Sequence, residues 1–195
     1  MNGMPLLLLV IFSAFTMNLT LQCGLGLKGA AEFNSSYKRI ILIKLGVIFT
    51  AVILLWLLFS RVIFPLFSGF FVYVLLFPVS YIIYDWFEYI VFGHILKRKT
   101  EEKDCVSFPG GITAVAVFIC LNITDNLTEA VLLSFGFTSG IFLVFMVIGE
   151  IRKRAALEAV PRFLRGKPLV LIAMGMLSLV FSTASLLILR MMALR

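Results

Sequence analysis

Asp85 and Glu88 are two carboxylate residues, three apart, within an apolar segment of this sequence. Their side chains are therefore candidates for a chemical role. Residues three apart on a helix share a face, and acidic side chains within a membrane span are candidates for an ion path. In the sequence, both residues also lie a short distance before the charged stretch KRKTEEKD, residues 97–104. An interfacial pair that contacts His94 or Lys97 is therefore the competing interpretation.

The three cysteines, Cys23, Cys105 and Cys120, have spacings that indicate neither a disulfide framework nor a CxxC zinc site. Cys23 and Cys120 lie in apolar segments, which is typical of small buried side chains in a reducing compartment. The sequence contains no Gly-rich phosphate loop, HExxH motif or nucleophile–base arrangement. Nothing in it therefore argues for hydrolysis or nucleotide binding.

The composition indicates a membrane protein, because 62% hydrophobic residues and a mean hydropathy of +1.10 exceed the values of ordinary soluble domains. No connection is long enough to fold as a soluble unit, so we expect residues 1–195 to form a single all-α membrane domain. The net charge of +7 comes largely from basic residues in short connections, which indicates membrane orientation rather than nucleic-acid binding. A complete reaction on a soluble substrate is not expected from this chain alone.

Four apolar runs have the length of a conventional membrane span: Ile40–Ser60, Leu66–Val91, Leu127–Ile148 and Pro168–Leu189. Lys44 lies near one end of its span, so its side chain can extend and place its charge at the membrane surface. Gly136 and Gly140 are four residues apart, an arrangement that lets another helix approach closely.

Two further apolar segments are interrupted. Phe108–Asn126 opens on Pro-Gly-Gly, closes on polar residues, and is too short for a hydrocarbon core of about 30 Å. It predicts a half-span that the other helices enclose, because irregular backbone at membrane depth must be covered. Pro5–Gly29 changes character from Thr16 onward, where polar residues and glycines break its apolar face. Together with the four long runs, these segments predict six transmembrane segments.

The distribution of basic residues predicts the orientation. The first, third and fifth connections hold thirteen Lys and Arg residues, against Arg61, Arg190 and Arg195 on the opposite side. These three loops are therefore expected to be cytoplasmic, with both termini outside. The halves, about 1–96 and 105–195, then have opposite topology, and each begins with an interrupted segment. This pattern of two inverted three-helix repeats predicts a site near the bilayer midplane.

The residues from Ile151 to Phe181 are similar to a known family. IRKRAALEAVPRFLRGKPLVLIAMGMLSLVF resembles the RnfA/NqrE subunits of the ion-translocating Rnf and Nqr electron-transport complexes. The family has a basic turn, a Val-Pro, a basic residue with glycine, and a small-residue-rich last span. Here these are Arg152 to Arg154, Val160-Pro161, Arg165-Gly166 and Gly175 to Phe181. Upstream, Leu121-Asn122-Ile123, Phe135-Gly136 and Glu88 also fit.

The resemblance implies six helices in two inverted repeats. It also implies two half-helices that each offer a cysteine, so that this chain, together with a paralogous E-type subunit, holds a [2Fe-2S] cluster within the membrane. The sequence departs from the family at these positions, because Lys28 and Thr113 stand where the cysteines are expected.

Two hypotheses follow for the cluster. Cys23 and Cys120 lie in the same interrupted segments, five residues before and seven after the expected positions, and thiolates are cluster ligands. A shift of seven keeps the helix face, whereas a shift of five rotates it by about 140°. Either this pair holds the cluster, or both cysteines are packing residues of a divergent member of the family that lacks it.

The resemblance implies an integral subunit, in a bacterial or archaeal cell (inner) membrane, of a complex that couples electron transfer to Na⁺ or H⁺ translocation. Its partners would be the paralogous E-type subunit, other Rnf/Nqr-like subunits and the lipid bilayer, and the chain alone would not be an enzyme. Two alternatives stay open: a small inverted-repeat secondary transporter or channel, and a redox-inactive structural subunit of the complex.

Overall fold

The computed structural model describes residues 6–22, 24, 38–66, 70–95, 110–157, 161 and 167–193. Almost all of these residues are helical, and none of them forms a strand. In chain order, the elements are α1 (Leu6–Ile11), the π-helical η1 (Phe12–Thr16), α2 (Leu19–Gln22), α4 (Lys38–Leu58), η3 (Phe59–Ile63), α5 (Phe64–Leu66), α6 (Phe70–Tyr89), η4 (Ile90–Ile95), α8 (Gly111–Ile123), α9 (Leu127–Leu157) and α10 (Lys167–Ala193).

Four helical stretches among the described residues are long and apolar enough to cross a membrane: Arg39–Leu66, Phe70–Gly93, Leu127–Ala155 and Pro168–Leu187. Each overlaps one of the long spans predicted from the sequence. The fold is therefore that of an all-α, multi-pass membrane protein. The third stretch runs past its predicted end at Ile148, because the polar residues that follow continue the helix. Glu150 forms ion pairs there with Lys153 and Arg154, three and four residues later.

The segment predicted as a half-span is short and enclosed, as expected. Its helix, α8, has 13 residues, a length of about 20 Å. It packs against α4, α6 and α9, and the residues that it buries include Ile112, Val117 and Cys120. The helix ends at Thr124, whose extended backbone leaves the helical path and whose hydroxyl donates to the Cys120 carbonyl oxygen at 2.7 Å.

The first segment is also interrupted, as predicted. Between η1 and α2 the helix breaks at Met17 and Asn18. The Asn18 side chain spans the break: its Nδ2 donates to the Ala14 carbonyl at 3.0 Å, and its Oδ1 accepts from the Thr20 and Leu21 amides at 3.2 and 3.4 Å. Asn18 thus ends one helix and caps the next, so the break is stable although it is buried.

Gly136 and Gly140 mark the closest approach between helices, which confirms the prediction made from their spacing. A Cβ atom at Gly136 would lie 2.8 Å from the Val10 carbonyl oxygen, and one at Gly140 would lie 2.6 Å from that of Ala14. The backbone of α1 and η1 therefore rests directly on α9, at a separation that only glycine permits.

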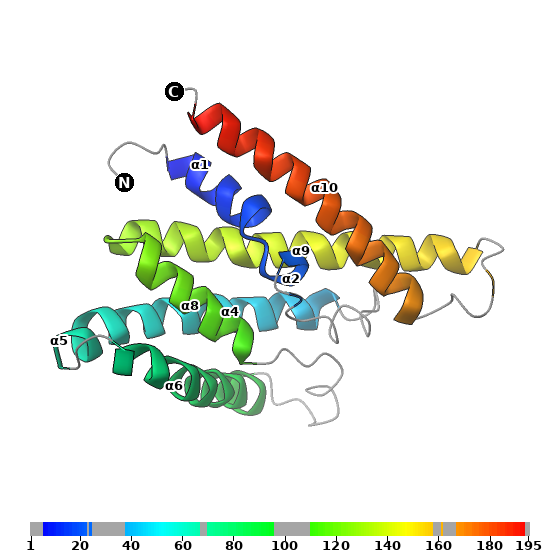
Figure 1. Cartoon of the computed structure of the whole chain (residues 1–195). Coiled ribbons are helices and arrows are strands. Elements are labelled where there is room, and N and C mark those ends of the chain that lie inside the picture. The colour runs from blue at the N-terminus through cyan, green and yellow to red at the C-terminus, as the bar shows by residue number, and fades with distance from the viewer. Residues whose placement is uncertain are drawn as a thin grey trace.

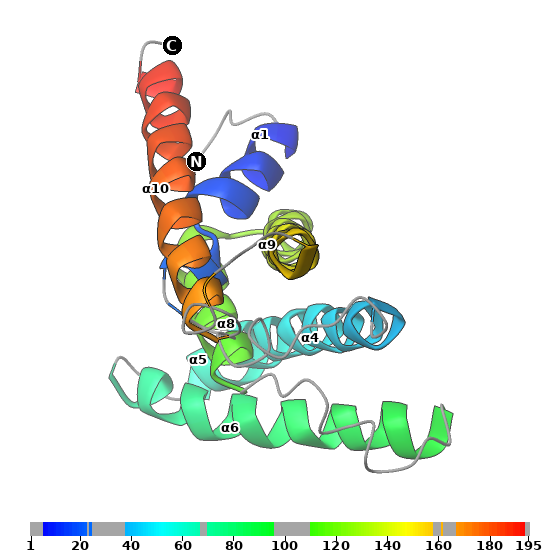
Figure 2. The same cartoon turned by 90° about the vertical axis from the view of Figure 1, so that its right-hand side faces the viewer.

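Both views show α6, α4, α9 and α1 in this order, whereas α10 runs steeply across them, from the level of α4 to beyond α1 (Figure 1 and Figure 2). The two short segments pack in a crossed manner. The segment α1–η1 contacts α9 and α10, which come late in the chain, whereas α8 contacts α4 and α6, which come early, in addition to α9. The central contact joins α4 to α9. The core among these helices includes Ile41, Leu55, Leu76, Val117, Leu133 and Phe145.

Candidate functional site

A buried ion pair joins α4 to α6. The Lys44 Nζ lies 3.0 Å from the Glu88 Oε1, and the two side chains are only 1% and 9% exposed. Lys44 was expected to extend toward the membrane surface, and this expectation is wrong. It lies in the second turn of α4, where its ammonium turns inward because a carboxylate on the neighbouring helix replaces its hydration.

Aromatic side chains enclose the pair along one stripe of α6 and η4. Phe92, one turn after Glu88, places its ring centroid 5.5 Å from the Lys44 Nζ, a cation–π contact. Tyr84, one turn before Glu88, is 1% exposed, and its hydroxyl has no hydrogen-bond partner among the described residues. The pair therefore lies in a protein-lined environment of low polarity, where its electrostatic interaction is stronger than at a surface.

Asp85 and Glu88 do not share an environment, although their spacing predicts a common face. Asp85 is exposed, whereas Glu88 is buried. Residues three apart on a helix differ by about 60° around its axis, so the boundary between the inner and outer faces of α6 runs between them. Among the described residues, the partner of Glu88 is Lys44 of α4. Lys97 and the side chain of His94 lie outside the described residues.

Thr113 and Cys120 lie seven residues apart on α8, and both are fully buried. The Thr113 hydroxyl donates to the Gly110 carbonyl oxygen at 2.6 Å. The Cys120 Sγ lies 3.7 Å from the Ser134 Oγ on α9. A ligand to a cluster shared with a second protein must reach the outer surface of its own chain, and Cys120 faces inward. Its geometry therefore favours the interpretation as a packing residue.

The other positions of the cluster hypotheses, Cys23 and Lys28, lie outside the described residues. Within the part of the chain that the structure describes, no group of three or more His, Cys, Asp or Glu side chains could hold a metal ion.

Sequence reasoning overlooked Lys44 as the partner of Glu88. The available signal was that each is an ionisable residue within an apolar run, since such residues pair with one another inside a membrane protein. Sequence reasoning also assigned no role to the polar residues at the helix break between η1 and α2. Thr16 and Thr20 are buried there, and neither hydroxyl has a hydrogen-bond partner among the described residues.

Chemically, a buried carboxylate paired with an ammonium can brace two helices, and a carboxylate within a membrane span is a candidate ion-path residue. Glu88 can accept a proton or coordinate a cation, and the Lys44 ammonium compensates its charge when neither is bound. The two groups come from different helices, so a change in the position of α6 relative to α4 would alter the balance between these states.

No model of a known protein family matches the chain. It is 39% identical over 61 residues to a protein of Actinobacillus pleuropneumoniae serotype 5b (strain L20) whose name describes it as the A-type subunit of an ion-translocating oxidoreductase complex. A protein of the same name from Glaesserella parasuis serovar 5 (strain SH0165) is 36% identical over 61 residues. Each match covers 31% of this chain and 32% of the relative, so the chain matches about a third of the length of these curated proteins.

Proposed function

We propose that this chain is an integral membrane subunit of an Rnf/Nqr-type complex that couples electron transfer to Na⁺ or H⁺ translocation. The observation that carries the proposal is the 36–39% identity over 61 residues to proteins named as A-type subunits of ion-translocating oxidoreductase complexes. The chain would be a non-catalytic part of a bacterial or archaeal cell-membrane complex. A paralogous E-type subunit would be its nearest partner.

The crossed packing of the short helices supports an architecture of two inverted repeats, with halves at about 1–96 and 105–195. Under this proposal α1–η1–α2 corresponds to α8, α4 to α9, and α6 to α10. Each short segment then packs against the two long helices of the other half, and the two corresponding central helices contact each other. A two-fold relation between the halves generates this exchange of contacts. Cytoplasmic basic loops and external termini belong to the same proposal.

Glu88 is the residue we propose for the ion path. It is buried, it faces a neighbouring helix, and its charge is compensated within the chain. Asp85, the other acidic candidate, lies on the outer face of α6 and has a weaker claim. A [2Fe-2S] cluster shared with a paralogue is a separate proposal, and the inward orientation of Cys120 supports the redox-inactive alternative instead.

The second candidate function is a small secondary transporter or channel. The buried Lys44–Glu88 pair favours it, because a single chain with two half-helices and a compensated carboxylate could move a cation without redox partners.

Purification through a tag on this chain separates these functions. We expect other subunits of the complex to co-purify, and the chain alone to transport no cation in proteoliposomes. In the purified complex, Cys120→Ser should leave the iron content and the reduced-state EPR spectrum unchanged, with Cys23→Ser measured beside it. Loss of a [2Fe-2S] signal in both variants would instead identify the cysteines as ligands. Cation transport by the isolated chain, without co-purifying subunits, would support the transporter.

A further inference from the structure

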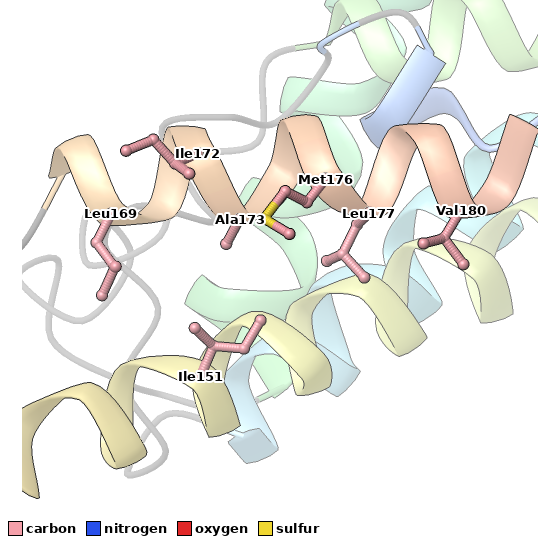
Figure 3. Close-up of a pocket in the computed structure, with 7 residues that line it drawn as sticks. All are labelled: Ile151, Leu169, Ile172, Ala173, Met176, Leu177 and Val180. Atoms are coloured by element: carbon pink, nitrogen blue, oxygen red, sulfur yellow. The ribbon is translucent and has the colours of Figure 1, made fainter. Parts of the chain in front are cut away.

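An apolar groove runs between α9 and the first half of α10. Figure 3 shows its lining side chains, most of them from α10, with Ile151 facing them from α9. The groove has a volume of about 400 Å³, which is within the range of small-molecule sites. All of its lining residues are apolar: Ile151, Leu169, Ile172, Ala173, Met176, Leu177 and Val180.

The groove meets positive charge at one end. On α9, Ile151 is followed by Arg152, Lys153 and Arg154. Arg154 lies one turn after Ile151, and its side chain reaches back over that turn, since its Nε lies 3.7 Å from the Glu150 Oε1. The Lys153 Nζ lies 4.0 Å from the same carboxylate, so Glu150 compensates only part of the charge. The side chains of Lys153 and Arg154 are 51% and 75% exposed, which leaves them accessible to a ligand.

We propose that this groove binds one anionic phospholipid, with an acyl chain along α10 and the phosphate beside Arg154. The basic residues fall at the end of the membrane-spanning stretch Leu127–Ala155, and α10 spans from Pro168, so the groove begins at the depth where headgroup meets acyl chain. Basic residues beside a groove between membrane helices are suited to anionic lipid headgroups. This inference does not depend on the proposed role in an Rnf/Nqr-type complex.

The lining favours an acyl chain over a helix of another protein. Helix–helix contacts in membranes are rich in small residues and interhelical hydrogen bonds. The groove has one small residue, Ala173, and its other lining residues are flexible aliphatic or thioether side chains without a hydrogen-bonding group aimed into it. Such a surface suits a flexible hydrocarbon chain, and the charge at its end selects the headgroup.

The test is native mass spectrometry of the full-length chain, titrated with phosphatidylglycerol or with phosphatidylcholine of identical acyl chains. We expect one phosphatidylglycerol to be retained with at least fivefold preference. Arg154→Gln should weaken its binding by about fivefold, because one basic residue near an anionic lipid contributes on the order of 1 kcal/mol. Met176→Trp, which fills the groove from a side chain that is 65% exposed, should reduce retention of either lipid.

Two matched variants make the result specific. Arg61→Gln removes an exposed charge from η3, away from the groove, and Leu179→Trp adds the same bulk at a 71% exposed position of α10 outside the lining. Both should bind phosphatidylglycerol as the unmodified chain does. Equal retention of the two lipids, or equal effects of each variant and its control, would overturn the proposal. A disulfide cross-link from Met176→Cys to another protein in the native membrane would also overturn it, because a partner helix would then occupy the groove.

Discussion

At the scale of single residues, the buried Lys44–Glu88 pair is the feature that most constrains function. A charge inside an apolar helix bundle persists only when a partner compensates it, and removal of one partner leaves the other charge buried. The same physics makes the pair a structural brace between α4 and α6, and under the proposed function a cation would compete with the ammonium there. Stability and transport measurements separate these two roles.

For stability, Lys44→Met should lower the free energy of unfolding by about 3–5 kcal/mol, because Glu88 is left buried without its counter-charge. The double variant Lys44→Met/Glu88→Leu should recover most of this loss, since two apolar side chains need no hydration. Thermal unfolding of the detergent-solubilised chain measures both. An equal loss of stability in the single and double variants would show that packing, rather than charge compensation, is responsible.

For function, Glu88→Gln should abolish electron-driven cation uptake in vesicles that contain the complex, because the amide can neither release a proton nor compensate a bound cation. Asp85→Asn is the matched control three residues away on the outer face of α6, and its uptake should stay within about twofold of the unmodified complex. Uptake that survives Glu88→Gln but fails in Asp85→Asn would transfer the ion path to the outer face.

At the scale of elements, the contact between η1 and α9 depends on two glycines. Length and composition were enough to predict the four long helices and both interruptions, because each follows from local sequence. The neighbours of each helix could not be predicted, because α4 and α9 are apolar around most of their circumference and no single face stands out. The pairing of Lys44 with Glu88 differs, because two ionisable residues within apolar runs were an available signal that was overlooked.

Gly136→Ala should destabilise the fold by about 1–3 kcal/mol, because the added methyl group would lie 2.8 Å from the Val10 carbonyl oxygen and against the Ser13 side chain. Gly175→Ala on α10 is the control. Its methyl group would meet no atom within 4 Å, so the helix should be unchanged or stabilised by up to about 1 kcal/mol. Thermal unfolding in detergent measures the pair. Equal effects at the two positions would argue against close packing of η1 on α9.

At the scale of the whole molecule, the crossed packing makes the two halves dependent on each other. The charge count and the two interrupted segments predicted repeats of opposite orientation, but they contained no information on which helices each short segment contacts. That information depends on tertiary packing. In the structure, α1–η1 packs against α9 and α10, and α8 packs against α4 and α6.

Division of the chain between residues 96 and 105 tests this dependence. Expressed separately, each half should be degraded, because its short segment lacks the long helices against which it packs. Co-expressed halves should associate and co-purify through a tag on either one. A half that is stable and monodisperse by itself in detergent would contradict the crossed arrangement. The unmodified full-length chain, carried through the same purification, provides the reference yield.

The contact of η1 with α9 has a consequence for biogenesis. The segment from Leu6 to Gln22 is made well before α9 and α10, the helices against which it packs. Its buried Asn18, Thr16 and Thr20 therefore lack the helices that cover them until more than a hundred further residues have been made. Packing of this early segment therefore follows synthesis of α9 and α10, and a ribosome stalled before α9 should leave the segment in a protease-sensitive state.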